Sequence, residues 1–141
     1  MLAKVLIAAT LCTFVLSACR DVNSPEGCAE AFVEAVYEGN TAEAFKLSRI
    51  DRSVPHTDAE HTALAVKTQV LAKIINDRKN ETKKLGGIRS VKAVKTAFSE
   101  DGKEAYVRVI LVYGNRSTDN DRVILNKSQD GKWVPNPDHQ I

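Results

Sequence analysis

The sequence predicts an α+β fold in which three amino-terminal helices, two short and one long, pack on a curved four-stranded antiparallel sheet. Apolar residues recur at helical spacing as far as Lys84, and from Ile88 onward they alternate with polar residues at a period of two. This second part is rich in β-branched residues and holds two Asp-Gly pairs, which are typical of strands joined by hairpins. We expect a single domain over residues 25–137.

The two short helices are predicted from their start signals. Ser24 is a suitable N-cap, and Pro25 then occupies the first helical position. The apolar residues that follow at helical spacing are Cys28, Phe32, Ala35 and Val36. Gly39 ends this helix, and Asn40 with Glu43 three residues later predicts the start of the second one.

A much longer helix is predicted over residues 58–84, after a polar stretch that runs through Pro55. Thr57 and Glu60 form the signature of a capping box at its start. Its apolar face is formed by Leu64, Leu71, Ile74 and Ile75. Gly86-Gly87 supplies the backbone freedom that a helix end needs.

Four strands are predicted in the rest of the chain, over residues 88–98, 105–113, 122–126 and 133–134. Successive side chains of a strand point to opposite faces, and Tyr106 and Tyr113 are seven residues apart, so we expect them on opposite faces of the sheet. Pro135 ends the last strand because proline has no backbone N–H for the ladder. Residues 138–141 are expected to form a flexible tail.

The amino terminus resembles that of a bacterial lipoprotein. Residues 5–15 carry no charge, and this run is long enough for the apolar core of a signal peptide but too short to cross a bilayer. Leu16-Ser17-Ala18-Cys19 then resembles a lipobox. The resemblance implies a signal peptide at 1–18, cleavage between Ala18 and Cys19, and a lipidated tether at 19–24. The alternative is an ordinary secretory signal with a chance cysteine.

Lipid on the Cys19 sulfur would make the bilayer the first partner of this protein, because two or three acyl chains give an effectively permanent anchor. In enteric-type sorting, aspartate directly after the lipidated cysteine retains a lipoprotein in the inner membrane. Arg20 occupies that place here. We therefore expect a palmitoylated envelope protein in the outer membrane, facing the periplasm.

Charge and cysteine content exclude other classes of protein. The 20 Lys and Arg residues are interleaved with 18 Asp and Glu, so there is no electrostatic footprint for nucleic acid. If the lipobox resemblance holds, Cys12 is removed with the signal peptide and Cys19 carries the lipid, which leaves Cys28 without a disulfide partner. Cys28 falls on an apolar helical stripe, so we interpret it as a buried core residue rather than a reactive thiol.

Three short motifs together resemble a known superfamily. They are Ala31-Phe32-x-x-Ala35, Gly39-Asn40-x-x-x-Ala44 and Asp130-Gly-x-Trp133. In this order they are similar to bacterial lipoproteins of unknown function that carry a nuclear transport factor 2-like (cystatin-like) domain. The resemblance implies a cone in which the curved sheet wraps around the long helix, sometimes with a pocket between them. Some members bind small molecules, a few are enzymes and many only associate with proteins.

The residues leave three functions open. The first is a membrane-anchored, non-enzymatic binding or protein-interaction module whose partner is another envelope protein. The second is a small-ligand pocket inside the cone, which would be lined by Leu64, Leu71, Phe98, Tyr106 and Trp133. The third is an enzyme that uses His61 as acid or base, with Asp58 one turn away to orient the ring. No spacing typical of a metal site or cofactor loop is present, so neither group is expected.

Overall fold

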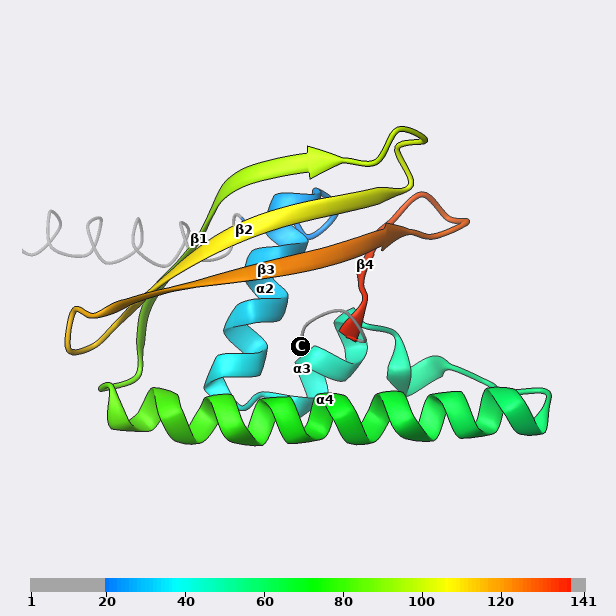
Figure 1. Ribbon diagram of the computed structural model, residues 1–141, viewed down its shortest axis with the longest axis horizontal. Helices are drawn as coiled ribbons and strands as arrows, with labels where there is room; N and C mark the ends of the chain where they lie inside the picture. The colour runs from blue at the N-terminus through cyan, green and yellow to red at the C-terminus, as the bar shows by residue number, and fades with distance from the viewer. Residues whose placement is uncertain (1–19, 138–141) are drawn as a thin grey trace, which may run out of the picture.

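The computed structural model describes residues 20–137, so the predicted signal peptide, Cys19 and the predicted tail lie outside the described residues (Figure 1). Its helices are α2 (Pro25–Glu38), α3 (Thr41–Leu47) and α4 (Asp58–Lys84), with a 3-10 turn η1 (Ile50–Arg52). Its strands are β1 (Ile88–Phe98), β2 (Glu104–Tyr113), β3 (Thr118–Lys127) and β4 (Trp133–Pro135). They form one antiparallel sheet in the order β1-β2-β3-β4. The predicted α+β class, with three helices on a four-stranded antiparallel sheet, is confirmed.

The cap signals in the sequence place the first two helices correctly. The Ser24 side chain accepts a hydrogen bond from the Gly27 N–H at 3.0 Å, and α2 begins at Pro25. Gly39 ends α2 with a φ of 79°, a left-handed conformation that glycine adopts without steric cost. Asn40 then caps α3 by accepting from the Glu43 N–H at 3.2 Å.

The central element of the fold is α2, which lies between the sheet and α4 (Figure 1). It contacts all four strands on one side and both α3 and α4 on the other. Its buried residues are Gly27, Cys28, Ala29, Phe32, Val33, Ala35, Val36 and Tyr37. A helix that is apolar over most of its circumference has to be covered on several sides, and this explains the layered arrangement.

The long helix begins and ends where the sequence predicts, and both halves of the Thr57–Glu60 capping box are formed. Only Leu71, Ile75 and Thr82 of α4 are buried, and Leu71 is already its middle residue. The cone expected from the family resemblance differs in one respect, because α2 rather than the longest helix covers the inner face of the sheet. The reason is that α4 is polar apart from one narrow stripe.

The two faces of the sheet alternate strictly along β2. Ala105, Val107, Val109, Leu111 and Tyr113 are buried against the helices, whereas the residues between them point to the opposite, outer face. Tyr106 and Tyr113 therefore lie on opposite faces, as parity predicts. Within residues 20–137, no helix is long and apolar enough to cross a membrane.

The predicted start of β3 at Arg122 is wrong, because the strand begins at Thr118. The four additional residues are polar, but their backbones pair with Val109–Val112 of β2. Ladder hydrogen bonds join backbone groups and do not require apolar side chains, so the hydrophobic pattern alone underestimates the length of the strand.

Each edge strand of the sheet, β1 and β4, has a feature that interrupts its free row of backbone hydrogen-bonding groups. The register of β1 against β2 shifts between Ala93 and Lys95, which leaves Val94 as an extra residue. The Ala93 N–H donates to Glu30 Oε2 of α2 at 3.1 Å instead of remaining open. At the other edge, β4 is only three residues long and ends at Pro135.

Candidate functional site

The interior between α2, α4 and β3 is almost completely filled. The cavity at this place has a volume of about 10 Å³, and it is lined by Phe32, Val33, Val36, Leu71, Ile74, Arg78 and Asp121. This volume accommodates roughly one water molecule. A small ligand of ordinary size does not fit between these elements.

A polar cluster closes this interior at the junction of three elements. The Tyr37 hydroxyl on α2 donates to Asp121 Oδ2 on β3 at 3.1 Å, and the Arg78 guanidinium on α4 lies 5.5 Å from the centroid of the Tyr37 ring. Burial raises the pKa of Asp121 above its ordinary value, while its hydrogen bonds and Arg78 act in the opposite direction. Burial and the Asp121 carboxylate raise the pKa of Tyr37. The cluster therefore joins the layers of the fold.

The five residues predicted to line a pocket lie in different places. Leu71 is fully buried in the core, and Leu64 lies half-buried beside the loop at 53–56. Tyr106 points to the outer face of the sheet. The structure brings Phe98 and Trp133 together at 5.9 Å between ring centroids, with 55% of Phe98 exposed.

His61, predicted as a candidate acid or base, is exposed on α4, and Asp58 is exposed as well. The buried imidazole that catalysis would need at this position is not present. Among the described residues, no group of three His, Cys, Asp or Glu side chains is arranged to hold a metal ion.

Cys28 is a core residue, as the helical stripe predicts. It is 1% exposed, and its sulfur lies 3.6 Å from the carbonyl oxygen of Trp133. Burial raises the pKa of the Cys28 thiol to about 12, while the charge of Arg49 acts in the opposite direction. Because the thiolate is the reactive form, this cysteine is protected from thiol chemistry.

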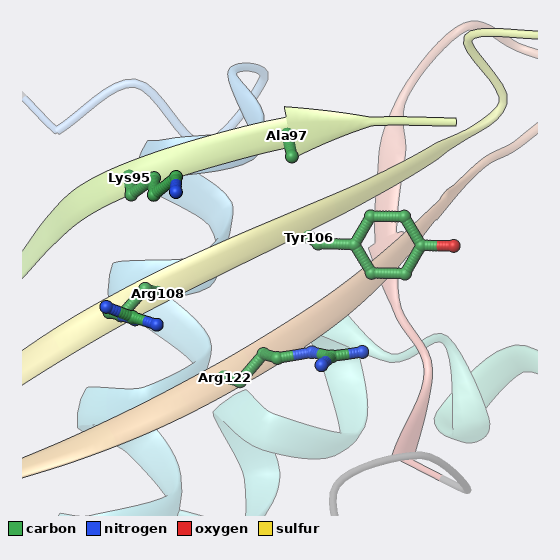
Figure 2. Close-up of a pocket in the computed structure, with 5 residues that line it drawn as sticks. All are labelled: Lys95, Ala97, Tyr106, Arg108 and Arg122. Atoms are coloured by element: carbon green, nitrogen blue, oxygen red, sulfur yellow. The ribbon is translucent and has the colours of Figure 1, made fainter. Parts of the chain in front are cut away.

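The most distinctive chemical feature is a row of three cations on the outer face of the sheet. Lys95 pairs with Arg108 across β1 and β2, and Arg108 pairs with Arg122 across β2 and β3. Figure 2 shows the three side chains on the same side of the sheet, together with Ala97 and Tyr106. These five residues line an open depression of about 320 Å³, which we call the outer-face site.

The residues that line the outer-face site include three cations and no carboxylate. None of the ion pairs among the described residues includes Lys95, Arg108 or Arg122. The Arg122 guanidinium lies 5.4 Å from the centroid of the Tyr106 ring, and the Tyr106 hydroxyl donates to Glu104 Oε2 at 2.6 Å. Like charges directly opposite one another on neighbouring strands destabilise a sheet. An anionic group bound between them would relieve this repulsion.

Sequence reasoning missed the outer-face site. The pocket predicted inside the cone includes Tyr106, so Tyr106 and its neighbour on the same face, Arg108, are not predicted to form an outer surface. The predicted third strand includes Arg122, but its pairing with Arg108 depends on the register between the two strands, which the hydrophobic pattern does not give. The bulge at Val94 shifts Lys95 into the row, and no pattern in the sequence marks that bulge. The sequence does contain one signal for this site. Every second residue of β2 is apolar and faces the helices, so Tyr106 and Arg108, which lie between them, belong to the opposite face.

A family described as Domain of unknown function (DUF4878) matches residues 17–134. Among solved structures, the crystal structure of a "Putative NTF2-like transpeptidase" from Campylobacter jejuni is similar at 20% sequence identity and a TM-score of 0.64. The likeness covers 79% of this chain and 96% of that chain, and it shows the NTF2-like fold. The comparison with curated proteins gave no match.

Proposed function

We propose a function for this chain, which belongs to the DUF4878 family of domains of unknown function. The proposal is that it is a non-enzymatic lipoprotein of the bacterial envelope. Its folded domain binds an acidic protein surface through the outer-face site. The observation that carries this proposal is the row formed by Lys95, Arg108 and Arg122, which has no acidic partner among the described residues.

The anchor part of the proposal rests on the sequence before the fold. The lipobox-like residues 16–19 follow an uncharged run of signal-peptide length. Acyl chains on Cys19 hold the domain at the outer membrane, on the periplasmic side. Tethering of this kind raises the local concentration of a binding module, so modest contacts with another tethered protein are sufficient.

The acidic partner follows from the shape and chemistry of the outer-face site. Guanidinium groups bind carboxylates through two parallel hydrogen bonds, and the site presents two of them beside an ammonium. Ala97 and the Tyr106 ring add apolar area next to the charges. An open depression suits the surface of a protein better than a small ligand, which favours enclosure. The filled interior gives further support, because it leaves the surface as the place for binding.

No reaction is part of this proposal. The name of the Campylobacter jejuni protein includes a transpeptidase activity, but at 20% identity the likeness concerns the fold alone. The exposed position of His61 gives no support for acid–base chemistry on this chain.

Binding is tested with a hexaglutamate peptide and the triple variant Lys95→Gln, Arg108→Gln, Arg122→Gln. The matched control removes the same charge from α4 through Lys73→Gln, Lys83→Gln and Lys84→Gln, which are exposed positions. We expect the outer-face variant to weaken peptide binding at least about tenfold and the control to change it less than about twofold. Equal losses in both variants would show that only net charge matters and would refute the site.

The anchor is tested separately by mass spectrometry of the protein isolated from its own membrane. We expect a chain that begins at Cys19 and carries acyl groups. An unmodified chain, or one that begins elsewhere, would refute the anchor and leave the peptide result standing.

A further inference from the structure

A second cationic depression lies where the described chain begins, and we call it the tether-side pocket. Its volume is about 350 Å³. It is lined by Val22, Asn23, Cys28, Lys46, Leu47, Arg49, Asp51, Arg52, Lys132 and Trp133. The lining comes from the residues before α2, from α2, from α3 and η1, and from the end of the chain at Lys132 and Trp133, so residues far apart in the sequence meet at one place. Figure 1 shows these elements in the whole fold.

Cations dominate this pocket. Arg49 is paired with Asp130 at 3.0 Å. Lys46, Arg52 and Lys132 take part in none of the ion pairs among the described residues, and their side chains are exposed. Asp51 is the single acidic residue in the lining. An anionic group entering this pocket would therefore meet an excess of positive charge.

The same place carries exposed apolar side chains. Trp133 is half-buried in the lining, and its ring contacts Phe98, which is 55% exposed. Val22 is 46% exposed, and the Lys127 ammonium lies 5.6 Å from the centroid of the Trp133 ring. Aromatic rings beside lysine and arginine are typical of surfaces that rest at the boundary between lipid headgroups and acyl chains.

Arg20 and Asp21, at the start of the described residues, are held to the fold. Arg20 forms ion pairs with Glu30 and Glu34 of α2, and the Asp21 carbonyl accepts from the Ser24 N–H at 3.3 Å. Arg20, the residue directly after Cys19, is therefore already held against α2. A residue spans at most about 3.6 Å, so lipid attached to Cys19 leaves almost no free linker. The surface around Val22 has to lie close to the bilayer.

We propose that the tether-side pocket binds the headgroup phosphate of an anionic phospholipid in the membrane that holds the anchor. This inference rests on the lipid anchor proposed above. Lys46, Arg52 and Lys132 contact the phosphate, and Trp133 with Phe98 enters the headgroup region. The contact fixes the orientation of the domain on the membrane.

Trp133 makes the proposal measurable, because it is the one tryptophan in the sequence. The lipidated protein from its own membrane is reconstituted into phosphatidylcholine vesicles that contain increasing amounts of brominated phosphatidylglycerol, a quencher of tryptophan fluorescence. We expect strong quenching of Trp133. In the triple variant Lys46→Gln, Arg52→Gln, Lys132→Gln, the amount of brominated lipid needed for half-maximal quenching should rise about tenfold.

Two variants serve as controls. Lys46→Arg, Arg52→Lys, Lys132→Arg keeps the charge and should keep the quenching, while Lys95→Gln, Arg108→Gln, Arg122→Gln neutralises the outer-face site and should also keep it. The unfolding temperature of each variant shows that it is folded. Quenching that the Lys46, Arg52 and Lys132 changes leave unaltered would refute the pocket.

Two further outcomes are distinguishable. Brominated phosphatidylcholine that quenches equally well would refute recognition of an anionic headgroup. A fluorescence response to inorganic phosphate without quenching by any brominated lipid would refute the membrane contact in favour of a free phosphate ligand. Mass spectrometry of the same preparation reports on the anchor, so its failure is not confused with failure of the pocket.

Discussion

The Tyr37 hydroxyl donates a hydrogen bond to Asp121 Oδ2 at 3.1 Å and thereby joins two residues 84 positions apart in the chain. The pair connects α2 with β3, and Arg78 of α4 covers the Tyr37 ring. All three layers of the fold meet here, beside the small interior cavity. The first two predictions concern this contact.

Tyr37→Phe removes the donor and leaves the Asp121 carboxylate without it in a partly buried place. We expect the free energy of unfolding to fall by about 1 kcal/mol, as measured by urea denaturation at neutral pH. Tyr106→Phe is the control, because Tyr106 donates to Glu104 on the outer face, where water can replace the bond. Equal losses in the two variants would contradict a special role for the Tyr37 contact.

Asp121 should make stability depend on pH in a direction opposite to that of a salt-bridged acid. Burial raises its pKa above the ordinary 3.8, so in the window between these two values the folded state binds more protons than the unfolded state. Its contribution to stability therefore falls as pH rises through that window and is constant above it. We expect Asp121→Asn to gain stability relative to the native chain as the pH rises through this window above about 3.8, and to keep a constant difference at higher pH. A difference that does not change with pH would contradict the raised pKa.

Relieving the repulsion in the cation row should stabilise the free protein. Arg108 lies directly opposite Lys95 and Arg122, so Arg108→Thr should raise the free energy of unfolding by about 0.5 kcal/mol at low salt. Lys92→Thr is the matched control, since Lys92 pairs with Ile110 and not with a cation. The advantage of Arg108→Thr should shrink as salt is added, because the Debye length falls.

Gly114 should tolerate alanine far less well than Gly87. A Cβ at Gly114 would overlap the Gly86 carbonyl oxygen, whereas a Cβ at Gly87 meets open space. Gly87 has a φ of 80°, so alanine at this position would have to adopt the left-handed conformation. We expect this strain alone to lower the free energy of unfolding by about 1 kcal/mol. We expect Gly114→Ala to cost about 2 kcal/mol or more in thermal unfolding. A smaller cost at Gly114 than at Gly87 would contradict the close approach of the two turns.

Thr57→Ala should loosen the first turns of α4 without lowering global stability much. The capping box contributes about 1 kcal/mol to a helix start. No residue of α4 before Leu71 is buried, so this part of the helix can open while the core stays intact. Hydrogen exchange should accelerate at residues 60–66, with little change near Ile75. Acceleration throughout α4 would show that the helix opens as one unit.

The helices were predictable because their ends are specified locally. Ser24 with Pro25 and Thr57 with Glu60 satisfy exposed amides within one turn, and such signals need no tertiary information. The true start of β3 was not predictable in the same way, because Thr118 and its neighbours are held by pairing with β2.

The candidate sites were far less accessible to sequence reasoning. The predicted pocket presupposed that α4 fills the cone, but the placement of α2 there depends on which apolar helix face packs best on the sheet. The outer-face site needs the register of three strands and the bulge at Val94. The tether-side pocket needs β4 and α3 to meet, although Lys46 and Trp133 are far apart in the chain.

The edge strands β1 and β4 do not favour pairing with another copy of the protein. Glu30 occupies the N–H of Ala93 on β1, and Pro135 withholds a donor from β4, so neither border offers a continuous run of free backbone groups to a neighbouring molecule. Copies gathered at high density on a surface would thus resist stacking strand to strand into larger aggregates, and each would keep its cationic face available for other contacts.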